Sequence, residues 1–207
     1  MKNSKAKYII LVKPTNKITF NLTDVFQKKI IKYRPWFLIF GSSKLTKNSI
    51  RFFDKTTKTE VEVSREGEIR YEELINLEKE VDIIRTIAII CGILKLTKTV
   101  YYEQKQQNSK LELFLSIVNV KEREILRNED LGVFGEFKFN EDNIELKDVF
   151  VLDKNFDAVS KVKSLALDFC KKADLPIDET LLENEIKNAI EILDNPLKLL
   201  QKNLNQQ

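Results

Sequence analysis

The spacing of apolar residues changes near residue 153 of this 207-residue chain. Before that point, stretches such as 111–120 alternate apolar and polar side chains, which is the period of strands with one buried face. From Asn155 onward the apolar residues recur every three or four positions, the spacing of helices packed on one side. The sequence therefore predicts an α+β fold, with an α+β domain over 1–153 and a helical segment over 154–207.

The expected strands form an antiparallel or mixed sheet. They cover residues 7–13, 17–22, 36–40, 49–53, 59–64, 100–103, 111–120, 133–139 and 144–152. The part of the chain over 98–152 is expected to be an antiparallel meander, because turn-forming residues such as those at 140–143 separate its strands. The shorter helices are expected over 24–34, 121–127, 155–172 and 179–193, with a last helix beginning at Pro196.

The longest helix is expected over 72–95. Its apolar residues follow helical spacing, and from Ile87 onward the segment is apolar on every side, which indicates one long buried helix. The alternative is a helix that ends near Arg85, followed by a strand over 87–96, because β-branched residues are frequent there.

Several classes of site are excluded by what the chain lacks. Without histidine it cannot use a His-containing catalytic dyad or triad, or a His-ligated zinc ion. Its five glycines form neither a GxGxxG nor a GxxxxGK[ST] motif, so the common phosphate-cradling loops are absent. The two cysteines, Cys91 and Cys170, lie at apolar positions and are expected to be buried, reduced thiols. We expect no cofactor.

The first seventeen residues do not have the pattern of a secretory signal peptide. The longest apolar run, 87–94, is far shorter than the ~20 residues that a membrane-spanning helix requires. We therefore expect a cytoplasmic protein with no membrane partner.

Charge is distributed very unevenly along the chain. Residues 1–53 contain twelve lysines or arginines and one carboxylate, Asp24, so this segment carries +11; because the whole chain carries +3, the remainder carries −8. Such asymmetry predicts a basic surface for an anionic partner, or an intramolecular match to the acidic remainder. The candidate binding residues are Lys28, Lys29, Lys32, Arg34, Lys44, Lys47 and Arg51.

The same segment is rich in aromatic residues. They are Tyr8, Phe20, Phe26, Tyr33, Trp36, Phe37, Phe40, Phe52 and Phe53. Most of these rings are expected in the core, but basic grooves with stacking rings also hold single-stranded nucleic acid. Our first hypothesis is a non-catalytic accessory protein that binds DNA or RNA largely independently of sequence, by neutralising the phosphate backbone.

The second hypothesis is a protein–protein adaptor or assembly subunit. Over 179–206 the leucines and isoleucines recur at spacings of three and four, as in helices that associate. This stretch predicts a docking arm or a homo-oligomer contact, with the basic surface serving an acidic protein. The alternative is a pair of helices that closes onto the chain's own domain.

The third hypothesis is a metal-dependent nuclease, and we rank it last. Asp130 and Glu136 supply carboxylates and Lys138 an ammonium, the groups that hold Mg²⁺ and orient water in such enzymes. Glu60 and Glu62 share one face of a strand and offer a second carboxylate pair. Exposed carboxylates and lysines on strands are common, so we assign no metal ligands.

Overall fold

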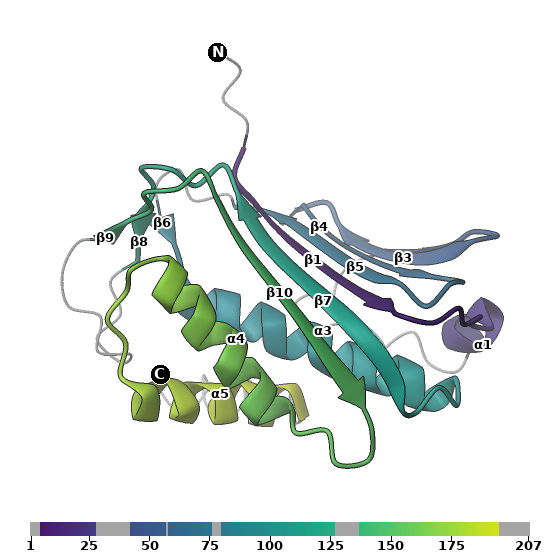
Figure 1. The fold of residues 1–207 in the computed structure, drawn as a ribbon. Coiled ribbons are helices and arrows are strands. Elements are labelled where there is room, and N and C mark those ends of the chain that lie inside the picture. The colour runs from purple at the N-terminus through teal and green to yellow at the C-terminus, as the bar shows by residue number, and fades with distance from the viewer. Residues whose placement is uncertain (1–4, 28–41, 57, 76–79, 127–136, 195–207) are drawn as a thin grey trace, which may run out of the picture.

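The computed structural model confirms the α+β fold and describes residues 5–27, 42–56, 58–75, 80–126 and 137–194 (Figure 1). Its main element is a seven-stranded sheet in the order β10-β7-β1-β5-β4-β3-β2. The strands are β1 (Lys7–Pro14), β2 (Ser42–Leu45), β3 (Ser49–Asp54), β4 (Thr59–Ser64), β5 (Ile69–Leu74), β7 (Ser109–Val118) and β10 (Asn143–Leu152). Every neighbouring pair in this sheet is antiparallel.

Helices cover one face of this sheet. The described helices are α1 (Leu22–Gln27), α3 (Ile83–Glu103), α4 (Ala158–Lys172) and α5 (Glu179–Asp194). The long helix α3 runs beneath the strands, and α4 and α5 pack on it (Figure 1). A small second sheet joins β6 (Glu80–Val81), β8 (Glu124–Ile125) and β9 (Phe137–Lys138).

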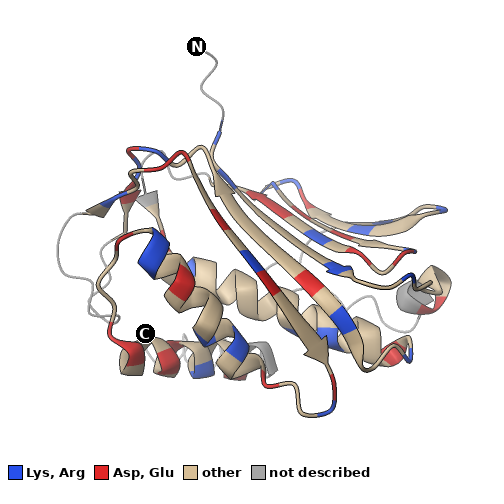
Figure 2. Cartoon of the chain, in the orientation of Figure 1, with Lys and Arg blue, Asp and Glu red and all other residues tan. Residues whose placement is uncertain are grey.

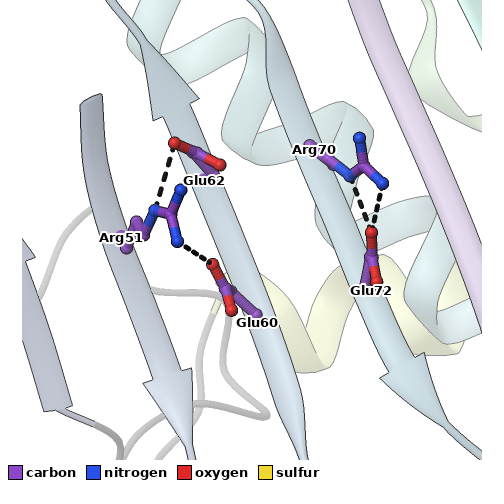
Figure 3. Close-up of a pocket in the computed structure, with 5 residues that line it drawn as sticks. All are labelled: Arg51, Glu60, Glu62, Arg70 and Glu72. Atoms are coloured by element: carbon purple, nitrogen blue, oxygen red, sulfur yellow. Dashed lines mark hydrogen bonds and ion pairs between the residues drawn. The ribbon is translucent and has the colours of Figure 1, made fainter. Parts of the chain in front are cut away.

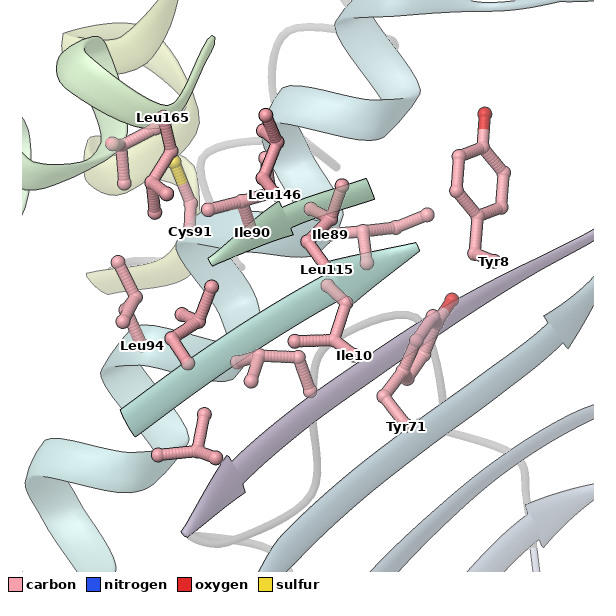
Figure 4. Packing of buried hydrophobic residues seen from close by; sticks show 14 of the residues in the cluster. Tyr8, Ile10, Tyr71, Ile89, Ile90, Cys91, Leu94, Leu115, Leu146 and Leu165 are labelled. Carbon is pink, nitrogen blue, oxygen red and sulfur yellow. The ribbon is translucent and has the colours of Figure 1, made fainter. Parts of the chain in front are cut away.

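The core lies between the sheet and α3. Alternate residues of each long strand face it, such as Ile10 on β1 and Leu115 on β7, and these are at most 1% exposed. They meet Ile89 and Ile90 of α3, as Figure 4 shows. Because α3 has the sheet on one side and α4 on the other, a helix that is apolar on all sides is the expected occupant of this position.

The long buried helix is confirmed, but its predicted start is wrong. Ile69, Tyr71 and Glu73 alternate toward the core on β5, and α3 begins only at Ile83. Asp82 sets that start, because its side chain accepts the backbone N–H of Arg85 and so caps the first turn. The strand replaces the predicted helix at 72–74, since pairing of β5 with β1 and β4 outweighs local preference there.

The end of this helix also differs from expectation. The structure continues α3 to Glu103, so the strands expected over 100–103 and, in the alternative, over 87–96 are wrong. The β-branched residues that suggested a strand fill the space between the sheet and the helices. Tertiary packing at this position outweighs their lower helix propensity.

Most other expected elements are confirmed. The strands expected over 7–13, 49–53, 59–64, 111–120 and 144–152 and the helices over 155–172 and 179–193 agree with the structure within a few residues. The strand expected over 17–22 is wrong, because 17–21 form no strand and Leu22 begins α1. The helix expected over 121–127 is wrong in its described part, 121–126, where a turn is followed by β8. The strand over 36–40, most of the helix over 24–34, the start of the strand over 133–139 and the helix from Pro196 lie outside the described residues.

Candidate functional site

The face of the sheet opposite α3 is covered by none of the described helices, and we call it the open face (Figure 1). Its side chains are the ones between the core positions, since successive residues of a strand point to opposite faces. Its cations are Lys7, Lys13, Lys44, Arg51, Arg70, Lys110 and Lys147, and its carboxylates are Glu60, Glu62, Glu72, Glu112 and Glu145. The described part of the open face therefore carries two net positive charges.

The basic segment contributes to this face from three strands. Lys7 and Lys13 lie on β1, and Lys44 of β2 lies directly opposite Arg51 of β3. Lys47 is exposed in the turn between β2 and β3, where its carbonyl accepts a hydrogen bond of 2.9 Å from Arg65. The structure thus brings three of the predicted binding residues together at one hairpin.

The other four predicted binding residues lie outside the described part of the chain. They are Lys28, Lys29, Lys32 and Arg34. Their role in binding therefore stays a prediction from the sequence.

Many open-face cations already have carboxylate partners. Arg51 lies 3.4 Å from Glu60 and 3.2 Å from Glu62, and Arg70 pairs with Glu72 around a hollow of about 310 Å³ (Figure 3). Burial alone would raise the pKa of Glu72, but hydrogen bonds and the charge of Arg70 and Lys7 lower it. Positive and negative residues accordingly lie close to one another on neighbouring strands in Figure 2.

The part of the open face on β1, β7 and β10 differs in having an aromatic ring between lysines. The ring centroid of Phe114 lies 4.9 Å from Nζ of Lys13 and 5.6 Å from Nζ of Lys147. Lys13 also pairs with Glu112 at 3.2 Å, whereas neither Lys110 nor Lys147 has an ion pair with a described residue. Sequence reasoning missed this group, although the polar alternation that Phe114 interrupts on strand 111–120 is a signal that marks it.

The carboxylates do not assemble a metal site within the described residues, where no three ligating side chains come close enough to hold an ion. Glu60 and Glu62 bind Arg51 instead. Lys138 lies 3.6 Å from Glu124, and its proposed companions, Asp130 and Glu136, are outside the described residues.

A buried polar cluster lies on the core side of β5, near the C-terminal end of this strand. Glu73 is 4% exposed; its Oε1 accepts a hydrogen bond of 2.7 Å from Nε of Arg85, and its Oε2 accepts the hydroxyl of Tyr71. Burial and the neighbouring carboxylate raise the pKa of Tyr71, so the phenol stays protonated. Both carboxylate oxygens are engaged, and the cluster ties β5 to the first turn of α3, which makes its role structural.

The stretch proposed as a docking arm is partly used inside the fold. Leu182 and Ile186 of α5 are completely buried, and α5 packs on α3 and α4. This part closes onto the chain's own core, while residues 195–206 lie outside the described residues.

Comparisons with known protein families, with curated proteins and with solved structures each found no match to this chain. Among the described helices, none is both long enough and apolar enough to span a bilayer.

Proposed function

We propose that this protein binds nucleic acid, without catalysing a reaction on it, through the open face of the sheet. The observation that carries the proposal is that the strand cations described within 1–53, together with Lys110 and Lys147, project from a single face. Such a face neutralises a phosphate backbone with little readout of base sequence. A nucleic-acid ligand also agrees with the cytoplasmic location expected from the sequence.

Existing ion pairs on this face are weak competitors for a polyanion. The side chains of Arg51 and Glu60 remain 48% and 45% exposed, and pairs at such exposure contribute about 0–1 kcal/mol. A phosphate that replaces one carboxylate therefore forfeits little, and it gains from counterion release on every further contact. No carboxylate has to be replaced at Lys44, Lys110 and Lys147, because these lysines have no ion pair with a described residue.

Fluorescence anisotropy with labelled oligonucleotides tests the proposal. We expect binding at about 50 mM salt that weakens steeply by about 200 mM, because each phosphate contact adds close to one to the logarithmic salt slope. Lys147→Glu and Lys44→Glu are expected to weaken binding and reduce that slope. Lys171→Glu is the matched control, since Lys171 is exposed on α4, on the side of the sheet that faces α3.

The sequence-based residues are tested separately with the double variant Lys28→Glu/Lys32→Glu, which we expect to abolish binding. Absence of binding by the unmodified protein at low salt would overturn the proposed function. Equal losses in Lys147→Glu and Lys171→Glu would show that only net charge matters, and would remove the open face from the proposal.

A protein–protein adaptor is the second candidate, and the edge strand β10 favours it. Val149 and Val151 on this strand are 50% and 47% exposed, and a strand at a sheet edge offers unpaired backbone groups to another chain. Deletion after Asn195 tests the C-terminal docking arm, and Val149→Lys tests the edge. An adaptor predicts a lower mass by light scattering in one variant, with the domain still folded; unchanged masses in both count against it.

A further inference from the structure

Phe114 occupies the middle of a row of side chains that crosses the open face. The strand register places it beside Lys147 of β10 on one side and Leu11 of β1 on the other. Phe114 is half-buried, so part of its surface meets solvent. Lys13 and Lys147 lie against it from two different strands, at 4.9 and 5.6 Å from its centroid.

The surroundings of Phe114 combine apolar surface with cations. Ile9 and Leu11 of β1 are half-buried neighbours on the same face. Lys110 is exposed further along β7. A ligand that rests here meets an aromatic and aliphatic platform in the centre and ammonium groups at the rim, where Lys13 also pairs with Glu112 at 3.2 Å.

We propose that Phe114 stacks an unpaired base while Lys13 and Lys147 bind the flanking phosphates, so that the ligand is single-stranded nucleic acid. This inference rests on the proposed function and names the class of its ligand. A duplex keeps the faces of its bases inside its own stack and presents phosphates and groove edges to a sheet surface, which leaves the Phe114 ring without a partner. A single strand presents both base faces and phosphates, and aromatic rings on open sheets stack such bases in RNA-binding domains.

The two lysines do not block this site. An exposed ammonium above a phenylalanine ring is held weakly. Lysine has a long, flexible stem, so each ammonium can leave the ring for a phosphate while its stem stays against the apolar surface. The ring is thereby freed for a base at the moment when the ammonium groups acquire stronger anionic partners.

Phe53 provides a matched control on the same face. It is also half-buried, but its cross-strand partner on β4 is Glu60, and no lysine is found over its ring among the described contacts. The Phe53 ring therefore lacks the two lysines that bind the flanking phosphates in the proposal. Phe53→Leu likewise removes one half-buried ring from the open face, but without touching the proposed site.

Anisotropy titrations of Phe114→Leu and Phe53→Leu test the inference, using a single strand of about 15 nucleotides, near the upper site size of single-strand-binding folds, and the matching duplex. Leucine keeps the apolar bulk and removes only the ring. We expect Phe114→Leu to weaken single-strand binding about 5- to 150-fold, the equivalent of one stacked base. Duplex binding by Phe114→Leu and single-strand binding by Phe53→Leu are expected to stay within about twofold of the unmodified protein.

Phe114→Trp gives a second readout. The chain's one native tryptophan is Trp36, so the signal added by the variant reports on position 114. We expect that signal to be quenched by the single strand and left unchanged by the duplex.

Two outcomes overturn the inference while the proposed function stands. They are equal affinity of the unmodified protein for single strand and duplex, and single-strand affinity unaffected by Phe114→Leu. If the unmodified protein binds neither probe at low salt, the proposed function fails with the inference, and a protein ligand for the open face is then favoured.

Discussion

Arg85 in the first turn of α3 donates hydrogen bonds from both Nε and Nη2 to the same oxygen, Oε1 of Glu73 on β5. The two partners are buried to very different extents, since the side chain of Arg85 is 42% exposed and that of Glu73 only 5%. Burial would lower the pKa of Arg85, but the carboxylate raises it, so the guanidinium stays charged. The pair fixes the start of the central helix against the sheet.

We expect Arg85→Met to destabilise the fold more than Glu73→Gln. Removing the arginine leaves a carboxylate in the core, which costs about 3 kcal/mol, the lower end for a broken buried pair. Removing the negative charge leaves an arginine that reaches solvent, together with an amide that still accepts from Tyr71, and costs about 1 kcal/mol. Urea unfolding at neutral pH measures both values, and the reverse order would contradict this account.

The destabilisation in Arg85→Met is expected to depend on pH. An unpaired buried carboxyl has a pKa above its unfolded value, because burial disfavours the charged form. The folded state then binds the proton more tightly than the unfolded state, so the variant recovers stability as pH falls and loses it as pH rises through that raised pKa. Arg85→Met/Glu73→Gln is the control, and its unfolding should not show this recovery.

Gly67, in the turn between β4 and β5, is expected to tolerate no side chain. Its φ is +83°, and a Cβ there would lie 2.4 Å from Cδ1 of Ile18. Its carbonyl also accepts a hydrogen bond of 2.8 Å from Tyr101, so the turn cannot easily move away. Gly67→Ala should lower the free energy of unfolding by about 1–3 kcal/mol, from left-handed backbone strain and overpacking.

The double variant Gly67→Ala/Ile18→Ala separates these two causes. Its free energy of unfolding should be lower than that of Ile18→Ala only by the cost of the left-handed backbone conformation, about 1 kcal/mol. An additive loss in urea unfolding would show that Ile18 does not obstruct the new methyl group.

Sequence reasoning recovered the parts of this fold whose pattern is local. The alternation of Leu111, Leu113 and Leu115 reports one buried face, and β7 follows from it. It failed over 72–74, where the spacing predicts the start of a helix, because these residues belong to β5, which is held in the sheet by pairing with the sequence-distant strand β1. A prediction that uses only the spacing of nearby residues assigns such residues to the helix that follows.

The candidate site also combines features that are visible in the sequence with features that depend on the fold. The excess of cations over 1–53 is visible in the sequence, but their partners are not, since Lys13 meets Glu112 only because β1 lies beside β7. The position of Phe114 between Lys13 and Lys147 likewise depends on three strands that are far apart along the chain. Composition alone led to the proposal of an anionic ligand, while the sheet order decides which side chains share one face.

Glu183 on α5 is expected to make stability depend on pH in the acidic range. Hydrogen bonds from Lys187 and from Lys163 of α4 lower the pKa of this carboxyl to about 2. A carboxyl with a pKa below its unfolded value of about 4.3 stabilises the fold above that value, and the contribution disappears as pH falls toward 2. At neutral pH the melting temperature of Glu183→Gln should therefore be lower than that of the unmodified protein. This difference should shrink as the pH falls toward 2.

Glu185→Gln is the control for this comparison, because Glu185 lies on the same helix and has no ion pair with a described residue. Its melting temperature should follow that of the unmodified protein at every pH. A difference between Glu183→Gln and the unmodified protein that persists at pH 2 would contradict the ion-pair explanation.

Both thiols of the chain are expected to be inert in the folded protein. Cys91 of α3 and Cys170 of α4 are 2% and 1% exposed, and burial raises the pKa of each to about 12. At pH 8 only about one thiol in ten thousand is then ionised, and the thiolate is the reactive form. A thiol-reactive dye should label neither cysteine in native buffer and both in denaturant, while Lys171→Cys, at an exposed position beside Cys170, should react at once. Rapid labelling of one equivalent in the unmodified protein would show that α3 or α4 opens far more readily than its packing implies.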